Sequence, residues 1–183
     1  SHKDNCFITL TFSPEELEKR NNPWSLDKVE FQLFMKKLRK KYGDHIRYFH
    51  CGEYGEKTYR PHYHALIFGH DFRISSKTNK VKKYGKKYPL YNSEELTNLW
   101  NKGHCTVGEL NFDTASYTAR YVTKKIKGEA SKIAITPQGV RKIEDVYCTM
   151  SRGNKKSKFN GIGEEAYHKY KHRWYGNDFI VNG

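Results

Sequence analysis

The sequence lacks the features that mark membrane-spanning, secreted and zinc-finger proteins. No apolar run approaches the roughly 20 residues that a membrane-spanning helix needs, and no secretory signal peptide is visible. The four cysteines, Cys6, Cys51, Cys105 and Cys148, are widely spaced and form no Cys-x-x-Cys pair. This spacing argues against a zinc finger and against a disulfide scaffold. We therefore expect Cys6, Cys51 and Cys105, which lie in strand-like runs, to be core thiols in a reducing cytoplasm.

Acidic residues are scarce relative to basic ones. The chain has 20 Asp and Glu against 34 Lys and Arg, which gives a formal net charge of +14. Such an excess favours polyanionic partners, nucleic acid ahead of anionic membrane surfaces. Aromatic residues make up 15% of the chain, and tyrosine is the commonest of them. Interleaved aromatic and basic residues suit single-stranded nucleic acid, although a solvated basic surface would also explain the charge.

The length of 183 residues suits a single domain over 1–183. Alternating apolar residues predict strands over 6–12, 45–54, 62–69 and 104–110. Capping residues and helical periodicity predict a short helix from Ser13-Pro14, a helix to Tyr42 capped by Ser25 or Asp27, one from Ser93 ended by Gly103, and one from Asp113 to about 127. Residues 70–92 are predicted to form an exposed loop. The pattern is weaker beyond 128, where we expect a strand within 140–150 and a helix within 164–174.

The stretch 50–69, HCGEYGEKTYRPHYHALIFG, carries a possible metal site. Side chains two apart on a strand share a face, so His62 and His64 point the same way and Tyr63 points the opposite way. If the two strands pair antiparallel, Glu53 lies near His62. A carboxylate and two imidazoles on one face predict a three-ligand site for a divalent ion. A half-buried, hydrogen-bonded histidine pair is the alternative.

A second group of interest lies in TASYTARYVTKKIKG, residues 114–128. Tyr117 and Tyr121 are four apart, so on a helix their side chains share a face, roughly 6 Å from each other. Lys124 follows one turn after Tyr121, with Lys125 beside it. Amphipathic packing of the two rings, with the hydroxyl groups in water, is the alternative explanation.

Taken together, these segments resemble the HUH endonucleases, the initiators of rolling-circle replication. The signature of that family is a first strand motif, a His-hydrophobic-His strand and a tyrosine helix, which correspond here to FITLTF, HYHALIF and YTARYVTKK. Gly52-Glu53 occupies the place of a further metal ligand in related initiators of small DNA viruses, and Tyr121 with Lys124 matches a Tyr-x-x-Lys motif. The paired tyrosines and GEYG…RPHYHALIFG resemble initiators of microviruses, especially the gokushovirus branch. The resemblance covers about 6–128, which leaves a basic C-terminal extension over 129–183.

The resemblance implies an α+β fold, RRM-like, with a central antiparallel sheet of about five strands flanked by helices. It implies nicking and rejoining of single-stranded DNA at a replication origin through a 5′-phosphotyrosine. Glu53, His62 and His64 would hold Mn²⁺ or Mg²⁺, with Zn²⁺ as an alternative. Tyr121 is the better-matched nucleophile and Tyr117 its partner, while Lys124 or Lys125 would stabilise the phenolate or protonate the leaving oxygen.

The implied setting is the cytoplasm of a host bacterium, with no membrane association. The sequence has no Walker motif, so we expect a host helicase and polymerase as partners. Candidates for phosphate contacts are Arg60, Lys82, Lys83, Lys155 and Lys156. Two alternatives stay open at this point: a non-catalytic module that binds single-stranded nucleic acid, and an HUH relaxase or transposase with the same chemistry and another role.

Overall fold

The structure is a computed structural model that describes residues 4–55, 58–74, 80–82, 89–123, 133–136, 139–153, 161–164 and 167–169. Within these residues, helices span Pro14–Glu18 (α1), Lys28–Tyr42 (α2), Glu94–Trp100 (α3) and Phe112–Thr123 (α4). The strands are β1 (Asn5–Leu10), β2 (Arg47–Tyr54), β3 (Pro61–Phe68), β4 (Lys80–Lys82), β5 (Leu90–Asn92), β6 (Cys105–Gly108), β7 (Ile133–Thr136), β8 (Gly139–Lys142) and β9 (Tyr147–Met150).

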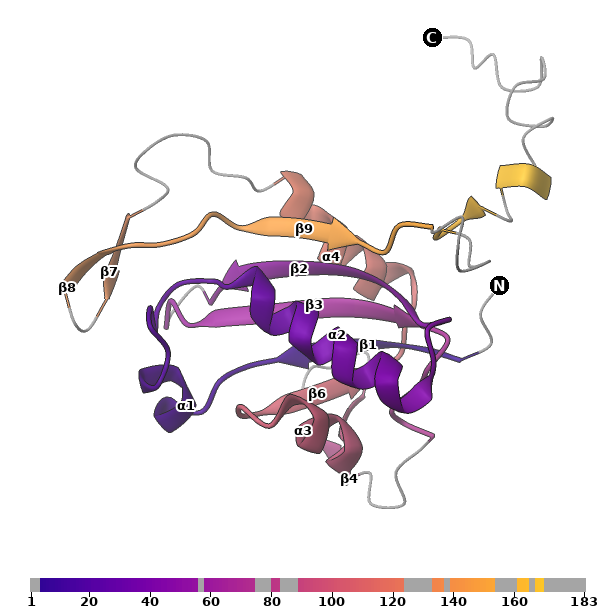
Figure 1. Ribbon diagram of the computed structural model, residues 1–183, viewed down its shortest axis with the longest axis horizontal. Helices are drawn as coiled ribbons and strands as arrows, with labels where there is room; N and C mark the ends of the chain where they lie inside the picture. Colours follow the sequence, from indigo (N-terminus) through magenta and orange to yellow (C-terminus); the bar gives the residue numbers. More distant parts are fainter. Residues whose placement is uncertain are drawn as a thin grey trace, which may run out of the picture.

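Seven of the strands form one antiparallel sheet in the order β4-β5-β6-β1-β3-β2-β9, and β7 pairs with β8 in a separate hairpin (Figure 1). The predicted α+β class with a central antiparallel sheet is thereby confirmed. The expected number of about five strands is too low, partly because β4 and β5 lie in the segment predicted as a loop. These two strands have three residues each and are rich in lysine and tyrosine, so they show no hydrophobic alternation. Their strand conformation depends on pairing with each other and with β6.

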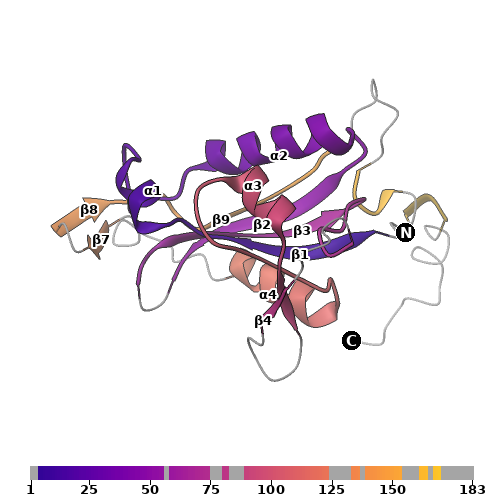
Figure 2. The ribbon, with the colours of Figure 1, turned by 90° about the horizontal axis from the view of Figure 1, so that it is seen from below.

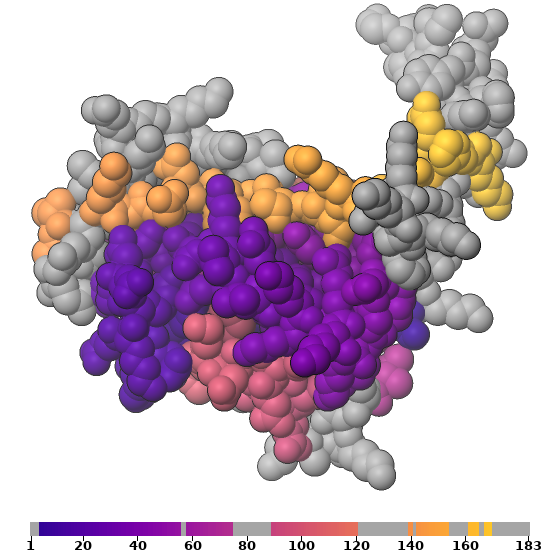
Figure 3. All heavy atoms as spheres, viewed as in Figure 1, coloured from indigo at the N-terminus to yellow at the C-terminus, as the bar shows by residue number. Residues whose placement is uncertain are grey.

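The two faces of the sheet are covered by different helices. Helix α2 lies across one face and α4 across the other, where it contacts β2, β3 and β9 (Figure 2). Strand alternation therefore sorts the side chains of β1 and β3 into two sets. Ile8 and Tyr63 belong to the core under α2, whereas the ring of His64 meets Tyr117 of α4 edge-on. In a view onto the α2 side, α1 and α2 form most of the described surface and β9 follows its upper edge (Figure 3).

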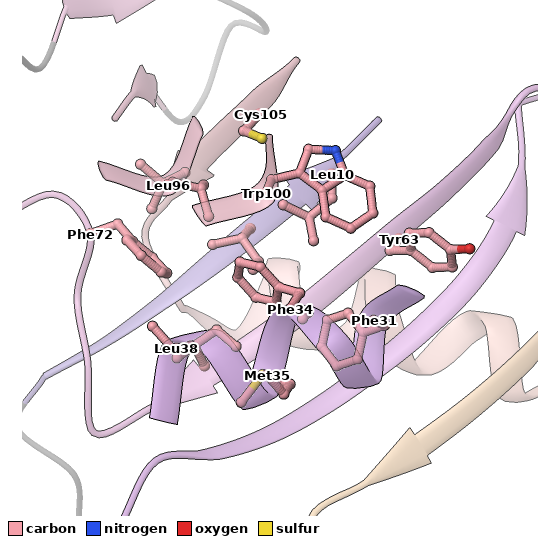
Figure 4. Close-up of a cluster of buried hydrophobic side chains, with 14 of the residues drawn as sticks. Leu10, Phe31, Phe34, Met35, Leu38, Tyr63, Phe72, Leu96, Trp100 and Cys105 are labelled. Atoms are coloured by element: carbon pink, nitrogen blue, oxygen red, sulfur yellow. The ribbon is translucent and has the colours of Figure 1, made fainter. Parts of the chain in front are cut away.

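The main core lies between α2 and the sheet. Helix α2 begins after Asp27, whose side chain accepts a hydrogen bond from the backbone N–H of Val29 at 2.8 Å. From this start, its apolar stripe faces residues of β1, β3 and α3. Figure 4 shows the side chains that meet there, among them Leu10, Phe31, Phe34, Met35, Leu38, Tyr63, Phe72, Leu96 and Trp100. Burial of each large apolar side chain contributes about 1.5–3 kcal/mol, so this cluster holds α2 on the sheet.

Two helix boundaries differ from the sequence prediction. Helix α3 ends at Trp100 because Asn101 takes the left-handed conformation with φ 51, and not at Gly103 as we predicted. Asparagine tolerates this conformation at the end of a helix. Helix α4 begins at Phe112, and Asn111 Oδ1 accepts a hydrogen bond from the backbone N–H of Thr114 at 3.0 Å. Asn111 is therefore the capping residue, and Asp113, the predicted cap, lies in the first helical turn.

The cysteines behave as the sequence predicts. Cys6, Cys51 and Cys105 are buried free thiols, and Cys148 is a partly buried one. Burial raises the pKa of Cys6 and of Cys105 to about 12, so these thiols remain protonated at neutral pH. In the part of the chain that the structure describes, no helix has the length and apolar character needed to cross a membrane.

Candidate active site

The candidate site lies on the α4 face of the two central strands β2 and β3. In their antiparallel register, Glu53 stands opposite His62, and Cys51 stands opposite His64. The predicted pairing of Glu53 with His62 is confirmed. Since alternate residues of a strand share a face, these four side chains point toward the side covered by α4. A carboxylate and two imidazoles thus lie together on one face.

The imidazole of His64 is held at both of its nitrogen atoms. Its Nε2 lies 2.5 Å from Glu53 Oε1, and its Nδ1 lies 3.0 Å from the hydroxyl oxygen of Thr9 on β1. The ring also stacks on Phe7, with ring centroids 5.7 Å apart and planes inclined by 6°. The side chains of His64 and Glu53 are only 9% and 10% exposed, so their contact is shielded from water. This arrangement fixes the position and tilt of the imidazole.

Helix α4 brings a tyrosine onto the same carboxylate. The hydroxyl of Tyr117 donates a hydrogen bond to Glu53 Oε1 at 3.3 Å. Its ring meets His64 edge-on, with ring centroids 5.3 Å apart and planes inclined by 89°. Tyr117 is still 38% exposed, so its phenol is reachable from solvent. One nucleophilic hydroxyl, one carboxylate and one imidazole are therefore in mutual contact.

His62 completes the set of nitrogen and oxygen donors on this face. Burial, with a smaller contribution from the neighbouring His64, lowers the pKa of His62 to about 4, so its imidazole is neutral at pH 7. A neutral imidazole has a free lone pair, which metal binding requires. Cys51 is different: its hydrogen bond with Cys148 and its burial raise the pKa of its thiol, which disfavours the thiolate needed for metal binding.

The donor types fit a hard divalent ion. A carboxylate oxygen and two neutral imidazole nitrogens suit Mn²⁺, Mg²⁺ and Zn²⁺, and Glu53 and His64 already lie in contact. In the described residues, however, no group of three or more His, Cys, Asp and Glu side chains is arranged to hold a metal ion. The direct hydrogen bond between Glu53 and His64 occupies donor atoms that a metal would need, so binding of an ion requires that bond to open.

Several of the predicted site residues are not placed by the structure. Lys83, Lys124, Lys125, Lys155 and Lys156 lie outside the described residues. Tyr121 and Lys82 are described by their backbone alone, within α4 and β4 respectively. The helical backbone puts Tyr121 one turn after Tyr117. Lys82 is on the edge strand β4, with β5, β6 and β1 between it and β3, so the structure does not bring it to the carboxylate.

Arg60 lies at the same end of the sheet as Glu53. Its carbonyl oxygen accepts a hydrogen bond from the backbone N–H of Gly55 at 3.0 Å, which closes the loop between β2 and β3. The following residue, Pro61, pairs with Tyr54, the neighbour of Glu53. Arg60 is half-buried. Among the predicted DNA contacts that the structure describes with side chains, Arg60 is the one beside the candidate site.

Two residues of the site were missed by the sequence analysis, Phe7 and Thr9. Both belong to β1, which pairs with β3 so that Thr9 stands opposite His64. Their spacing of two residues puts them on one face, but nothing in the sequence shows which β3 residue each one meets. The register of two strands more than 50 residues apart is set by the packing of the whole sheet.

Comparisons with known proteins connect this geometry to phage replication. A family model described as a replication-associated protein of the ORF2 type matches residues 5–126, which include β1, β2, β3 and α4. The chain is 32% identical over 187 residues to the replication-associated protein VP4 of Bdellovibrio phage phiMH2K, an alignment that covers 97% of this chain and 52% of that protein. It is 32% identical over 186 residues to the replication-associated protein ORF2 of Spiroplasma virus 4, with 98% and 52% covered.

A third relative is the replication-associated protein ORF4 of Chlamydia phage 1, which is 33% identical over 132 residues. That alignment covers 68% of this chain and 32% of the relative. The chain thus spans about half the length, or less, of the curated relatives it matches. No solved structure matches the chain significantly.

Proposed function

Since the chain belongs to this family of ORF2-type replication-associated proteins, we propose that it nicks and rejoins single-stranded DNA at a replication origin. This activity would initiate rolling-circle replication of a single-stranded DNA phage in the cytoplasm of its bacterial host. One observation carries the proposal. The hydroxyl of Tyr117 donates to Glu53, and the same carboxylate oxygen contacts His64.

Glu53, His62 and His64 would hold a divalent ion, with Mn²⁺ or Mg²⁺ preferred and Zn²⁺ as an alternative. When bound, such an ion supplies Lewis-acid stabilisation of the charge that develops on the scissile phosphate. The protein contributes a shielded, low-dielectric setting for that charge, because Glu53 and His64 are almost buried. The neutral state of His62 at pH 7 supports its role as a ligand.

A tyrosine hydroxyl is the proposed nucleophile. The phenol oxygen attacks phosphorus, the phosphorus bond to the 3′ oxygen breaks, and the products are a 5′-phosphotyrosine and a free 3′-OH. The phenol proton is lost and the leaving oxygen gains one, for which Lys124 or Lys125 is the proposed acid. The covalent intermediate conserves the energy of the phosphodiester bond, so the ends can be rejoined without ATP.

Two tyrosines allow the cycle to repeat. One would hold the parental 5′ end while the other cuts the regenerated origin after a round of synthesis. Tyr117 is supported by its contact with Glu53, and Tyr121 by its match to the Tyr-x-x-Lys motif. Their separation of one helical turn would let both reach one phosphate in succession.

Phosphate contacts are proposed for Arg60, Lys82, Lys83, Lys155 and Lys156. The net charge of +14 supports a polyanionic partner. Arg60 is the best supported of these residues because it lies at the loop that joins the two central strands. A host helicase and polymerase would unwind and copy the circle.

The test uses single-stranded oligonucleotides that span the origin of a related phage, labelled at either the 5′ or the 3′ end. Wild type, Tyr117→Phe, Tyr121→Phe and the double mutant are incubated with Mn²⁺ and resolved on a denaturing protein gel. Tyr59→Phe is the matched control because Tyr59 is an exposed tyrosine outside α4. We expect the 3′ label to migrate with the protein and the 5′ label to remain on a free fragment.

The adduct should disappear with EDTA and in the double mutant, and persist in Tyr59→Phe. Each single mutant should retain part of the activity if the two tyrosines alternate. Tight binding to the origin strand without any adduct would contradict the nuclease proposal. That result would instead support the alternative of a non-catalytic module that binds single-stranded DNA.

A further inference from the structure

Resting on the proposed metal site, we propose that Thr9 is a positioning residue for His64. It would hold the ring so that Nε2 is the nitrogen that ligates the ion. Thr9 stands opposite His64 in the register of β1 and β3. Its hydroxyl oxygen lies 3.0 Å from Nδ1 of that histidine, on the side of the ring away from Glu53.

The contact selects one ring nitrogen. A histidine ring can rotate by half a turn and exchange the positions of its nitrogen and carbon atoms. In this site, rotation would lose the hydrogen bond to Thr9 and the contact between Nε2 and Glu53 together. Phe7 stacks flat on the same ring and limits its tilt. The hydroxyl therefore works with Phe7 to keep Nε2 directed at the carboxylate.

A hydroxyl group is suited to both states of the site. Without metal, Nε2 shares a proton with Glu53, and the hydroxyl of Thr9 can donate to Nδ1 when that atom carries none. With metal on Nε2, Nδ1 carries the proton, and the same hydroxyl oxygen can accept it by rotating. Partners of this kind, which fix the tautomer and orientation of a metal-binding histidine, typically change metal affinity by about 10–100-fold when removed.

The chain offers a matched control close to Thr9. Thr11 lies directly after β1, and its hydroxyl donates to the carbonyl of His104 at 2.9 Å. Thr9→Val and Thr11→Val each remove one hydroxyl and keep the branched shape. Thr9→Ser restores the hydroxyl at the site. His64→Ala measures the complete loss of the imidazole.

The experiment is a titration of the metal-free proteins with Mn²⁺, with the affinity measured calorimetrically. The thermal unfolding of each metal-free variant is measured alongside. We expect Thr9→Val to bind Mn²⁺ about 10-fold more weakly than wild type or worse. Thr9→Ser should return close to the wild-type affinity, and Thr11→Val should match wild type.

The outcomes separate this inference from the proposed function. If His64→Ala binds weakly but Thr9→Val binds like wild type, the metal site is correct and the role of Thr9 is wrong. If Thr9→Ser loses as much affinity as Thr9→Val, the hydroxyl is not the active feature, and the inference also fails. If wild type itself binds no Mn²⁺, or binds it no better than His64→Ala, the proposed metal site falls and the inference with it.

Discussion

Acid should destabilise this protein through His50, a histidine far from the proposed chemistry. His50 is 2% exposed and stacks on Phe31 with ring centroids 3.6 Å apart. Its Nδ1 lies 2.8 Å from the hydroxyl of Thr149, and its Nε2 lies 3.4 Å from the hydroxyl of Tyr147. Burial lowers the pKa of His50 from 6.5 to about 3, so the folded protein keeps this ring neutral.

The sign and size of the effect follow from linkage. Between pH 6.5 and about 3, the unfolded chain binds a proton at His50 and the folded chain does not. Stability is therefore fully present above pH 6.5 and falls as the pH is lowered through this window. At about 1.4 kcal/mol per pH unit, His50 should remove about 2 kcal/mol from the free energy of unfolding between about pH 7 and about pH 5.

The assay is denaturant unfolding of wild type and His50→Gln at about pH 7 and about pH 5. Glutamine keeps polar atoms for Thr149 and Tyr147 but does not titrate. His62, whose pKa burial lowers to about 4, acts in the same direction in both proteins, so the comparison isolates His50. Wild type should lose about 2 kcal/mol more than His50→Gln over this range.

A second readout comes from the NMR signals of the His50 ring, which should not titrate above about pH 5. Equal pH dependence of the two proteins, together with a His50 titration near its ordinary pKa of about 6.5, would refute the reasoning. In that case water would reach the ring despite its stacked position.

Three other predictions concern the packing and the metal. Gly52→Ala should lower the free energy of unfolding by about 1–3 kcal/mol, because a Cβ there would lie 2.8 Å from Tyr147 Cε1; unchanged denaturant stability would show that the ring can move aside. Tyr63→Phe should cost about 1–3 kcal/mol in the same assay, since its buried hydroxyl bonds backbone and carboxylate groups, while Tyr59→Phe, at a position 53% exposed, should change little. Mn²⁺ should raise the Tm of wild type and EDTA should reverse the shift; a rise of equal size in Glu53→Gln would contradict the assigned ligand.

Much of the fold could be predicted from local patterns. The strand around 5–10, the helix ending at Tyr42 and the central pair of strands follow from alternation, periodicity and capping residues close together in the chain. The opposite orientation of Tyr63 and of its neighbours His62 and His64 needs only the two-residue repeat of a strand. These features depend on short-range geometry, which the sequence states directly.

Other features required the tertiary structure. The strands β4 and β5 have no apolar alternation and exist because β6 supplies their hydrogen-bond partners. The cap of α4 is Asn111 and not Asp113, because polar residues of the same kind compete at nearby positions. Local propensity does not rank such competitors.

The candidate site divides in the same way. The sequence by itself determined which residue types could act, Glu53 with the two histidines on adjacent strands and a tyrosine helix that follows them. Only the tertiary structure decided that Tyr117 reaches Glu53 and that Thr9 and Phe7 hold His64. The physical reason is that strand register and the docking of α4 depend on contacts between residues more than 50 positions apart, which no local pattern encodes.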